Sequence, residues 1–459
     1  AFLIWSSLFT ASYSDQLVVA VSPSRCRWPP PPSVRISQVE PYPRTWAEIN
    51  LPALGRNLAR ARALVGPDVK VALVAKADAY GHGLIPVSRY AVRNGADWVA
   101  VATVQEGISL RDSGVDAPVI ALSPMLDIEA EQAVFYGLDV VVERASTVQA
   151  LGRAAVSGGR TARVHLKVDT GLGRFGAPVE KASEIAEEVA RVPGVALVGV
   201  SQHFSNSYGD PEATRVQAER FERALQDCEA RGVKFEMVHM ANSAAVLMHP
   251  QMHRNLVRVG MLAYGFGPAS EALGCEPVMV WKARVTAMRT VPAGTALSYG
   301  GSHVTERESR IATVGVGYGD GYPRSASNRA HVAFEGRQVR VVGTVCMDQL
   351  LIDVTEVPEV GLSDTVTLIG PGSTAYDLAE AAGTISHEIV CRLMSRVPRR
   401  YDFGMRAPSP FRSAGRSHRR RRSRCGYSQG PHRTAPCRAR CGRWQPSRVP
   451  GSRSPSPAH

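Results

Sequence analysis

The sequence predicts an α/β fold, a (β/α)8 TIM-like barrel followed by a mostly β C-terminal domain. Between Thr45 and about Met261, short apolar segments alternate with amphipathic helical patterns, and there are eight such repeats. Repeats of this kind favour a parallel barrel over an open sheet. After about Glu276 the pattern changes to alternating β-branched residues between Gly-rich turns, which is typical of a β domain.

Each element is expected where its periodicity is clearest. The helical patterns of the barrel lie at 104–113, 179–192 and 213–231, and the β domain shows a helix signal only near 375–396. The barrel strands are expected at 70–75, 98–103, 118–122, 139–142, 163–168, 196–201, 236–240 and 256–262, and strands of the β domain at 281–291, 310–318, 338–345 and 364–369. Barrel chemistry lies at the carboxyl ends of the strands, so the polar residues there are the candidates.

The domain boundaries follow from changes in composition. We expect the barrel at 44–275 and the β-rich domain at 276–401. Residues 402–459 are rich in Arg, Ser and Pro and are expected to be a disordered tail. Residues 1–43 begin with an apolar segment like that of a signal peptide, yet no basic residue precedes Arg25. We interpret them as a disordered leader or an artefact of upstream translation.

Charge and cysteine usage exclude several classes of function. The formal net charge of +13 lies in 402–459, which hold 14 arginines and one acid, so 1–401 balance 40 basic against 40 acidic residues. The body therefore gives no electrostatic case for nucleic acid, and only the tail, with its run Arg419–Arg422, could bind it nonspecifically. The sequence contains no run of 18 apolar residues, so a membrane-spanning helix is not predicted. Eight scattered cysteines without C-x-x-C pairs argue against a zinc site and fit a cytoplasmic protein.

The segment VAKADAYGHG, residues 74–83, carries the strongest chemical signal. Lys76 directly follows an apolar strand, where partial burial lowers the pKa of an amine and lets it condense with an aldehyde. A lysine there is more often a side chain that only closes the strand with its amine in solvent. The neighbours favour the functional interpretation, because Tyr80 adds a hydroxyl while Gly81 and Gly83 let the backbone approach an anion closely.

This segment resembles the pyridoxal-phosphate lysine motif of the alanine racemases, a fold-type III family, and the resemblance runs from about Thr45 to Tyr401. It implies that Lys76 bonds to pyridoxal 5'-phosphate and serves as one base, and that Tyr80 helps to hold the cofactor phosphate. Asp78 departs from the motif, since many members have Asn there. It lies beside the lysine and away from the cofactor, so the departure is tolerable.

The segment HLKVDTGLGRFG follows the fifth predicted strand, and its glycines spell GxGxxG. A dinucleotide site would also need an acidic residue further on and an open βαβ unit, so this pattern alone is weak. The segment resembles the racemase motif that places Lys167 and Arg174 near the active site. The resemblance makes Lys167 a candidate for carbamylation and directs Arg174 to the cofactor phenolate and the substrate carboxylate. An inward barrel lysine paired with an acid is the alternative for Lys167.

Further candidates follow the last three barrel strands. His203 stands in SQHFSN, and the resemblance assigns it to packing against the pyridine ring. Asn242 and Ser243 open an expected helix, where free N–H groups favour a phosphate, although capping alone would also explain them. Arg258 and Gly260 end the eighth strand, and phosphate sites of barrels often lie after strands seven and eight. The resemblance places Arg258 at the pyridine nitrogen, where arginine donates a hydrogen bond and hardly protonates the ring.

The β domain is expected to supply the remaining groups. By resemblance Tyr299, in ALSYGG, is the second base, opposite Lys76, because racemisation needs proton removal on one face and return on the other. Tyr318 is a further cofactor-binding candidate, and the backbone N–H of Met347 would hold the substrate carboxylate. Cys346 has no evident partner base and is expected to be a packing residue. The resemblance also implies a homodimer in which the barrel of one chain and the β domain of the other share each site.

The predicted function is therefore the interconversion of L- and D-alanine, which supplies D-alanine for cell-wall peptidoglycan. One alternative is a related racemase with broader substrates such as serine. A decarboxylase on the same barrel is expected to carry an acid where Arg258 stands. A pyridoxal-phosphate homeostasis protein consists of the barrel alone and lacks Tyr299.

Overall fold

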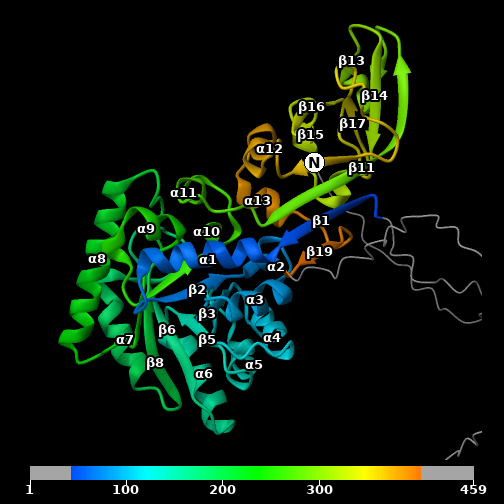
Figure 1. Ribbon diagram of the computed structural model, residues 1–459. Coiled ribbons are helices and arrows are strands. Elements are labelled where there is room, and N and C mark those ends of the chain that lie inside the picture. Colours follow the sequence, from blue (N-terminus) through cyan, green and yellow to red (C-terminus); the bar gives the residue numbers. More distant parts are fainter. Residues whose placement is uncertain (1–42, 405–459) are drawn as a thin grey trace, which may run out of the picture. The chain divides into compact units, whose positions relative to one another are not determined.

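The computed structural model describes residues 43–404, so the expected leader before residue 43 and the expected tail beyond 404 lie outside the described residues. Parallel strands surrounded by helices form the first part of the chain (Figure 1). The strands are β2 (Lys70–Val74), β3 (Trp98–Val101), β4 (Val119–Ala121), β5 (Asp139–Val142), β6 (Ala162–Asp169), β8 (Val195–Ser201), β9 (Met237–His239) and β10 (Leu256–Val259).

These eight strands are arranged in the order β10-β2-β3-β4-β5-β6-β8-β9. The barrel is nearly closed between the two ends of this series. The backbone N–H of Arg258 donates to the carbonyl of Ala241 over 3.0 Å. The side chain of Asn255 accepts from the N–H of Val238 over 2.8 Å. A parallel sheet covered on both faces reads as continuous apolar runs, and β3, β4, β5 and β10 are buried along their whole length.

Several of the helices between the strands are capped by side chains that the sequence provides. Thr103 and Glu106 form a capping box at the start of α4, and Asp210 caps α8. The longer barrel helices are α1 (Leu51–Val65), α3 (Leu84–Arg93), α4 (Val104–Asp112), α6 (Ala145–Ser157), α7 (Ala182–Ala190) and α8 (Pro211–Ala230). The shorter ones are α2 (Lys76–Tyr80), α5 (Ala130–Phe135), α9 (Ser243–Met248), α10 (Met261–Tyr264) and α11 (Pro268–Ala272).

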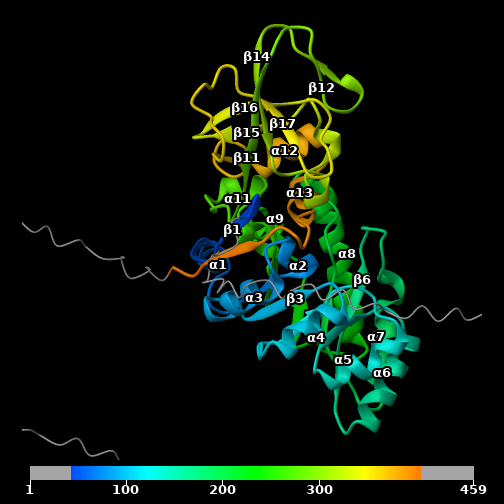
Figure 2. The same ribbon diagram turned by 90° about the vertical axis from the view of Figure 1, so that its right-hand side faces the viewer.

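A largely antiparallel sheet forms the second part of the chain (Figure 2). Its strand order is β14-β17-β16-β15-β18-β11-β1-β19, and β12 (Ala296–Leu297) and β13 (His303–Val304) make a separate hairpin. The bounds are β1 (Thr45–Asn50), β11 (Met279–Val291), β14 (Ser309–Val314), β15 (His331–Phe334), β16 (Arg337–Val342), β17 (Leu350–Asp353), β18 (Thr365–Ile369) and β19 (Arg399–Asp402). Two helices follow β18, namely α12 (Ala375–Ala382) and α13 (Ser386–Cys391).

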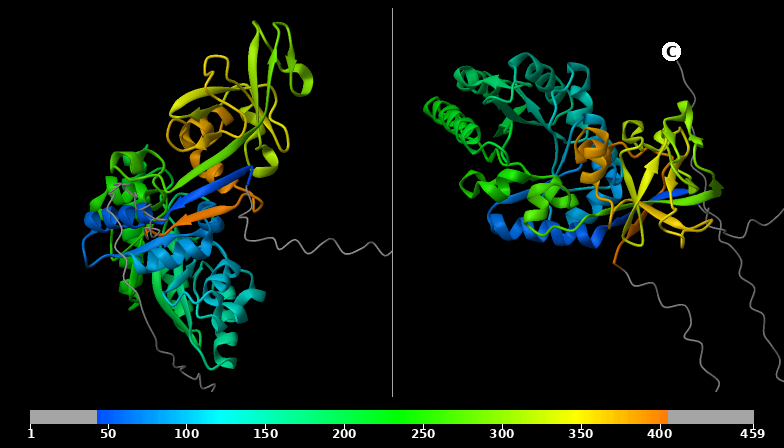
Figure 3. Two further views of the ribbon diagram at one scale, coloured as in Figure 1. Left: turned by 45° about the vertical axis from the view of Figure 1, so that its right-hand side comes forward. Right: turned by 90° about the horizontal axis from the view of Figure 1, so that it is seen from above.

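The first strand, β1, belongs to this second sheet although it precedes the barrel in the sequence. It pairs antiparallel with β11 and parallel with β19, and Figure 3 shows β1 beside β19. Its Trp46, Ala47 and Ile49 are buried. No strand was expected there, because local periodicity does not reveal a partner more than two hundred residues away. The domain boundaries that we drew from composition remain an expectation.

The predicted fold class is confirmed. The structure differs in one detail that affects the site: the predicted strand 256–262 ends at Val259, and α10 begins at Met261. Gly260 makes this change of direction possible. Within residues 43–404 no helix is both long and apolar enough to cross a membrane.

Candidate active site

Ala75 separates Lys76 from the end of β2, and after Lys76 the chain makes a left-handed helical turn. Ala77, Asp78, Ala79 and Tyr80 have φ values of 54°, 55°, 54° and 53°. Such a run is costly for residues other than glycine, roughly 1–2 kcal/mol per residue. It persists only where surrounding groups hold it, and strained backbone of this kind is common beside functional groups.

Hydrogen bonds from several elements hold this turn. The carboxylate of Glu106, the capping residue of α4, accepts from the N–H of Ala77 over 2.7 Å. Asp78 accepts from the N–H of Leu84, the first residue of α3, over 2.7 Å. The guanidinium of Arg399 donates to the carbonyl of Gly81 over 3.1 Å. The turn that follows Lys76 is therefore stabilised by hydrogen bonds from more than one element.

A cavity of about 320 Å³ lies at the carboxyl ends of the barrel strands, and five of the predicted site residues line it. They come from different strands and loops: Lys76, Lys167, Arg174, His203 and Arg258. Its other lining residues are Leu122, Ser123, Pro124, Val141, Phe175, Ser201 and Gln202. The structure thus brings together side chains that are up to 182 positions apart in the sequence.

Arg258 is a buried cation, with an exposed fraction of 5%. One terminal nitrogen of its guanidinium donates to Nδ1 and to the carbonyl of His239 over 2.8 and 3.0 Å. The other donates to the carbonyls of Gln202 and Met240 over 2.8 and 3.3 Å, and to Nδ1 of His203 over 3.3 Å. Burial lowers the pKa of Arg258 to about 10, so the side chain stays charged at neutral pH.

Lys167 and Arg174 both lie near the aromatic ring of Phe175. Nζ of Lys167 is 5.6 Å and Cζ of Arg174 is 5.4 Å from the ring centroid of Phe175. Nζ of Lys167 also donates to the carbonyl of Val168 over 2.9 Å. Burial, followed by the positive charge of Arg258, lowers the pKa of Lys167 to about 7. A substantial fraction of this amine is therefore neutral at physiological pH.

The pKa values of Lys76 and His203 are both lowered, by burial and by a nearby positive charge. Burial, and then the charge of Arg174, lowers the pKa of Lys76. Burial, and then the charge of Arg258, lowers the pKa of His203 to about 2. His203 is consequently a neutral ring at every physiological pH, and its Nδ1 accepts from Arg258.

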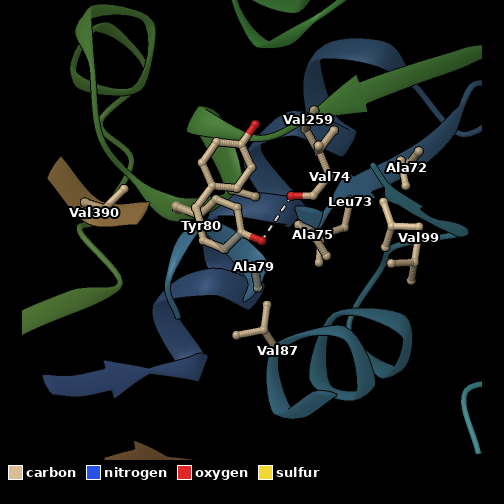
Figure 4. Close-up of a cluster of buried hydrophobic side chains, with 14 of the residues drawn as sticks. Ala72, Leu73, Val74, Ala75, Ala79, Tyr80, Val87, Val99, Val259 and Val390 are labelled. Carbon is tan, nitrogen blue, oxygen red and sulfur yellow. Dashed lines mark hydrogen bonds between the residues drawn. The ribbon is translucent and has the colours of Figure 1, made fainter. Parts of the chain in front are cut away.

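Tyr80, Ser243 and Gly260 meet beside the cavity, where β10 ends. A Cβ atom at Gly260 would lie 2.8 Å from the hydroxyl oxygen of Tyr80, so only glycine leaves this space open. Oγ of Ser243 accepts from the N–H of Gly260 over 3.0 Å, and Asn242 caps α9 through the N–H of Ala245. Tyr80 packs in the hydrophobic cluster that Figure 4 shows, together with Val74 and Val390. Among the described residues its hydroxyl has no hydrogen-bond partner.

Two of the predicted residues of the β domain, Tyr299 and Met347, lie in another hollow. Tyr299 and Met347 line it together with Ser298, Cys346, Asp348 and Gln349, and its volume is about 450 Å³. The exposed fractions of Tyr299 and Met347 are 72% and 54%, which are high for large side chains. Neither residue lines the cavity of Lys76. Tyr318, on the 3₁₀ turn Tyr318–Asp320, also lines neither.

The backbone around Met347 is tightly supported. A Cβ atom at Gly317 would lie 2.2 Å from the carbonyl oxygen of Cys346 and 2.4 Å from that of Met347, so two loops touch there. Arg396 donates to the carbonyl of Met347 over 3.3 Å and forms an ion pair with the buried Asp320 over 2.8 Å. Cys346 is partly buried, and its thiol lies 3.5 Å from the hydroxyl of Ser298.

Sequence reasoning missed several groups beside the cavity. His387, on α13, lies near Tyr80, with ring centroids 6.0 Å apart and ring planes tilted by 45°. Burial and then the charge of Lys76 lower the pKa of His387. Cys391, also on α13, interacts electrostatically with Lys76 and has its pKa raised by burial to about 11. No local pattern in the sequence predicts that these two residues lie near Lys76. Ser201 and Gln202 could have been found, because they directly precede His203.

The rejection of a dinucleotide site is supported by the hydrogen bonds of the GxGxxG segment. The N–H groups of Gly171, Leu172 and Gly173 donate to the carboxylate of Asp169 over 3.0, 3.0 and 3.2 Å. The N–H of Gly176 donates to Glu143 over 2.7 Å. The donors that a pyrophosphate would need are therefore already used.

Comparison with known families identifies this barrel and its β domain. The family described as "Alanine racemase, N-terminal domain" matches residues 49–268, and "Alanine racemase, C-terminal domain" matches residues 278–401. The chain belongs to the alanine racemase family. Two alanine racemases illustrate the degree of similarity. That of Halothermothrix orenii is 39% identical over 365 residues, which cover 78% of this chain and 96% of the relative. That of Symbiobacterium thermophilum is 42% identical over 366 residues, which cover 78% and 97%.

Solved alanine racemase structures agree with this assignment. The enzyme from Streptomyces lavendulae superimposes with a TM-score of 0.74 at 37% identity, over 78% of this chain and 97% of that one. The enzyme from Bacillus anthracis, solved with bound L-Ala-P, has a TM-score of 0.74 at 32% identity over 79% and 95%. Because almost the whole length of each relative is covered, both domains of the family are present here.

Proposed function

We propose that this chain is a pyridoxal-phosphate-dependent enzyme that interconverts L- and D-alanine by a two-base mechanism and supplies D-alanine for cell-wall peptidoglycan in the cytoplasm. The observation that carries the proposal is the convergence of Lys76, Arg174, His203 and Arg258 on one cavity at the carboxyl ends of the barrel strands. Membership of the alanine racemase family supports the choice of substrate.

The residues present fit the cofactor. Lys76 offers an amine of lowered pKa, and Gly260 leaves open the space beside the hydroxyl of Tyr80, where a phosphate would find a donor. Oγ of Ser201 and Nε2 of Gln202 are buried without partners among the described residues, and both residues line the cavity. Buried polar atoms of this kind point to a polar ligand. We infer that Asn242, Ser243 and Tyr318 also contribute to cofactor binding.

Pyridoxal phosphate, when bound, supplies the electron-withdrawing system that acidifies the α-hydrogen of an amino acid. The residues do the rest. Lys76 holds the cofactor and moves a proton at the α-carbon on one face, and Tyr299 does so on the other. Arg174 and the N–H of Met347 bind the substrate carboxylate, and the neutral His203 positions the ring.

Arg258 favours racemisation over the chemistry of the decarboxylase alternative. Its four terminal N–H groups are engaged with His239, Gln202, Met240 and His203, so Nε–H is the donor left over. A guanidinium with a pKa of about 10 donates a hydrogen bond and gives up no proton at neutral pH. It therefore leaves the ring a weak electron sink, which favours return of the proton to the α-carbon.

A homodimer would complete this site. Tyr299 and Met347 are exposed in a hollow of their own, and neither lines the cavity of Lys76 within one chain. A second copy that presents this hollow to the cavity would supply the second base and the carboxylate-binding N–H. Two such sites are then formed by one interface, as expected for a twofold dimer.

The test is direct. Purified full chain is incubated with pyridoxal phosphate and L-alanine, and the enantiomers are resolved by chiral chromatography. We expect D-alanine to reach half of the total, and D-alanine to give the same mixture. L-Serine is run in parallel to measure substrate breadth. Binding of the cofactor without turnover of either amino acid would favour a homeostasis protein, and loss of carbon dioxide would favour a decarboxylase.

A further inference from the structure

A series of buried side chains leads away from the cavity, from Arg258 through His239 and His165 to Asp139. A terminal nitrogen of Arg258 is 2.8 Å from Nδ1 of His239. Nε2 of His239 is 3.0 Å from Nδ1 of His165, and Nε2 of His165 is 3.0 Å from Oδ2 of Asp139. The exposed fraction of each of these four residues is 5% or less. They come from four different barrel strands, β10, β9, β6 and β5.

The chemistry of the four groups allows one arrangement of protons. Arginine only donates, so Nδ1 of His239 must accept. A neutral imidazole carries one N–H, so Nε2 of His239 donates to Nδ1 of His165. Nε2 of His165 then carries its proton and donates to the carboxylate of Asp139. Every hydrogen bond in the series points from the cavity toward Asp139.

A second proton on either ring would break the series. An imidazolium at His239 would place an N–H against the guanidinium of Arg258, and an imidazolium at His165 would force the same clash one step further on. Burial, together with the charge of Arg258, also holds the pKa of His239 well below its usual value. Two further charged groups face the series: Lys167, whose charge also lowers the pKa of His239, and Arg163, whose Nε lies 3.2 and 3.3 Å from the two oxygens of Asp139.

The backbone is shaped around this series. A Cβ atom at Gly199, on β8, would lie 2.1 Å from Nδ1 of His165. The glycine therefore provides the space in which the imidazole lies between β6 and β9. The ring of His165 also meets the edge of Trp98, with centroids 5.9 Å apart at an angle of 79°. Its orientation is fixed by packing as well as by hydrogen bonds.

We propose that Asp139, His165 and His239 are positioning residues that form a one-way hydrogen-bond relay behind Arg258. The relay supplies the buried counter-charge of the guanidinium and fixes which N–H is left for the cavity. Buried charges require such pairing, and networks of this kind strengthen when every donor and acceptor is used. The use made of Arg258 rests on the proposed function, whereas the proton arrangement does not.

Neutron diffraction from crystals of the full chain in D₂O tests the arrangement directly. We expect deuterium on Nε2 of both His165 and His239, none on their Nδ1 atoms, and none on Asp139. Deuterium on Nδ1 of either ring would overturn the relay. This result does not depend on activity, so a chain that fails to racemise alanine would refute the proposed function and leave the relay standing.

Substitution of Asp139 tests its effect on the site. The amide of Asp139→Asn can either accept from or donate to His165, so we expect deuterium on both nitrogens of His239 in a mixed population. We expect kcat to fall about tenfold at unchanged KM, the factor that corresponds to one lost charge-assisted hydrogen bond. Arg163→Gln is the control, because it removes the outer partner of Asp139 and should keep kcat within about twofold. Native deuterium positions and native kcat in Asp139→Asn would refute a positioning role.

Discussion

The carboxylate of Glu106 accepts the backbone N–H of Ala77 at 2.7 Å and thereby joins the start of α4 to the left-handed turn after Lys76. The same carboxylate accepts from Ala102 and Thr103 over 2.8 and 3.3 Å. One side chain thus serves both as the cap of a helix and as the support of a strained turn. The position of the catalytic amine that we propose depends on a neighbouring repeat of the barrel.

Removal of this carboxylate should destabilise the fold. Glu106→Ala leaves three N–H groups without their acceptor, so we expect the free energy of unfolding to fall by about 1–2 kcal/mol. Urea denaturation followed by circular dichroism measures it. Glu106→Gln keeps one acceptor oxygen, so its free energy of unfolding should lie between those of the native chain and Glu106→Ala. Glu131→Ala, on the exposed face of α5, is the control. Equal stability of Glu106→Ala and the control would refute this role.

Lys76→Ala should abolish covalent attachment of the cofactor. The reason is that Lys76 follows a barrel strand and has its pKa lowered by burial at the cavity. Borohydride reduction in the presence of pyridoxal phosphate, followed by peptide mapping, should label the native chain at Lys76 and leave the variant unlabelled. Racemisation should be lost with it. Lys70→Ala changes an exposed lysine on the same strand and should retain the label. Labelling of another cavity residue at the native level in Lys76→Ala would refute the assignment of Lys76 as the residue that bonds to the cofactor.

Tyr299→Phe should impair the two directions of the reaction unequally. Each proposed base serves one face, so loss of the hydroxyl leaves Lys76 able to act from its own side. Deuterium wash-in at the α-carbon, measured from L-alanine and from D-alanine separately, should slow far more for one enantiomer. Tyr376→Phe, which changes an exposed residue of α12, is the control. Equal slowing for both enantiomers would mean that Tyr299 only binds substrate.

Lys167 should react reversibly with carbon dioxide. A neutral amine adds to CO₂, forming a carbamate and releasing one proton, and burial lowers the pKa of Lys167 to about 7. Because the neutral form increases as pH rises through about 7, the carbamate signal in ¹³C NMR with labelled bicarbonate should grow from pH 6 to pH 8. Lys167→Gln should remove this signal, and Lys282→Gln should not. A signal unchanged in Lys167→Gln would assign it to another amine.

Deletion of 406–459 should change the binding of polyanions and leave the enzyme unaffected. These residues hold all 14 of the arginines beyond Tyr401, whereas residues 1–401 are balanced in charge. We expect elution from heparin at lower salt and with a weaker salt dependence. Racemase activity and the oligomeric state, measured by light scattering, should stay within about twofold. A loss of activity or of the dimer would show that the segment is a working part of the protein.

Several features could be read from residues and spacing alone. Parallel strands buried on both faces appear as short apolar runs, so β5 was predicted with its observed bounds. The carboxyl ends of such strands meet at one end of a barrel. Lys76, Lys167 and Arg258 could therefore be expected at one site from the sequence alone. The cavity that these residues line agrees with that expectation.

Other features depended on the packing of distant segments. The pairing of β1 with β11, the approach of His387 to Tyr80, and the oriented series behind Arg258 each join residues that no local period connects. The sequence by itself determined which side chains end each strand, because periodicity and turn chemistry are local properties. Only the tertiary structure decided which of them share hydrogen bonds and burial, and thus which amines are neutral, because those energies depend on neighbours brought together by folding.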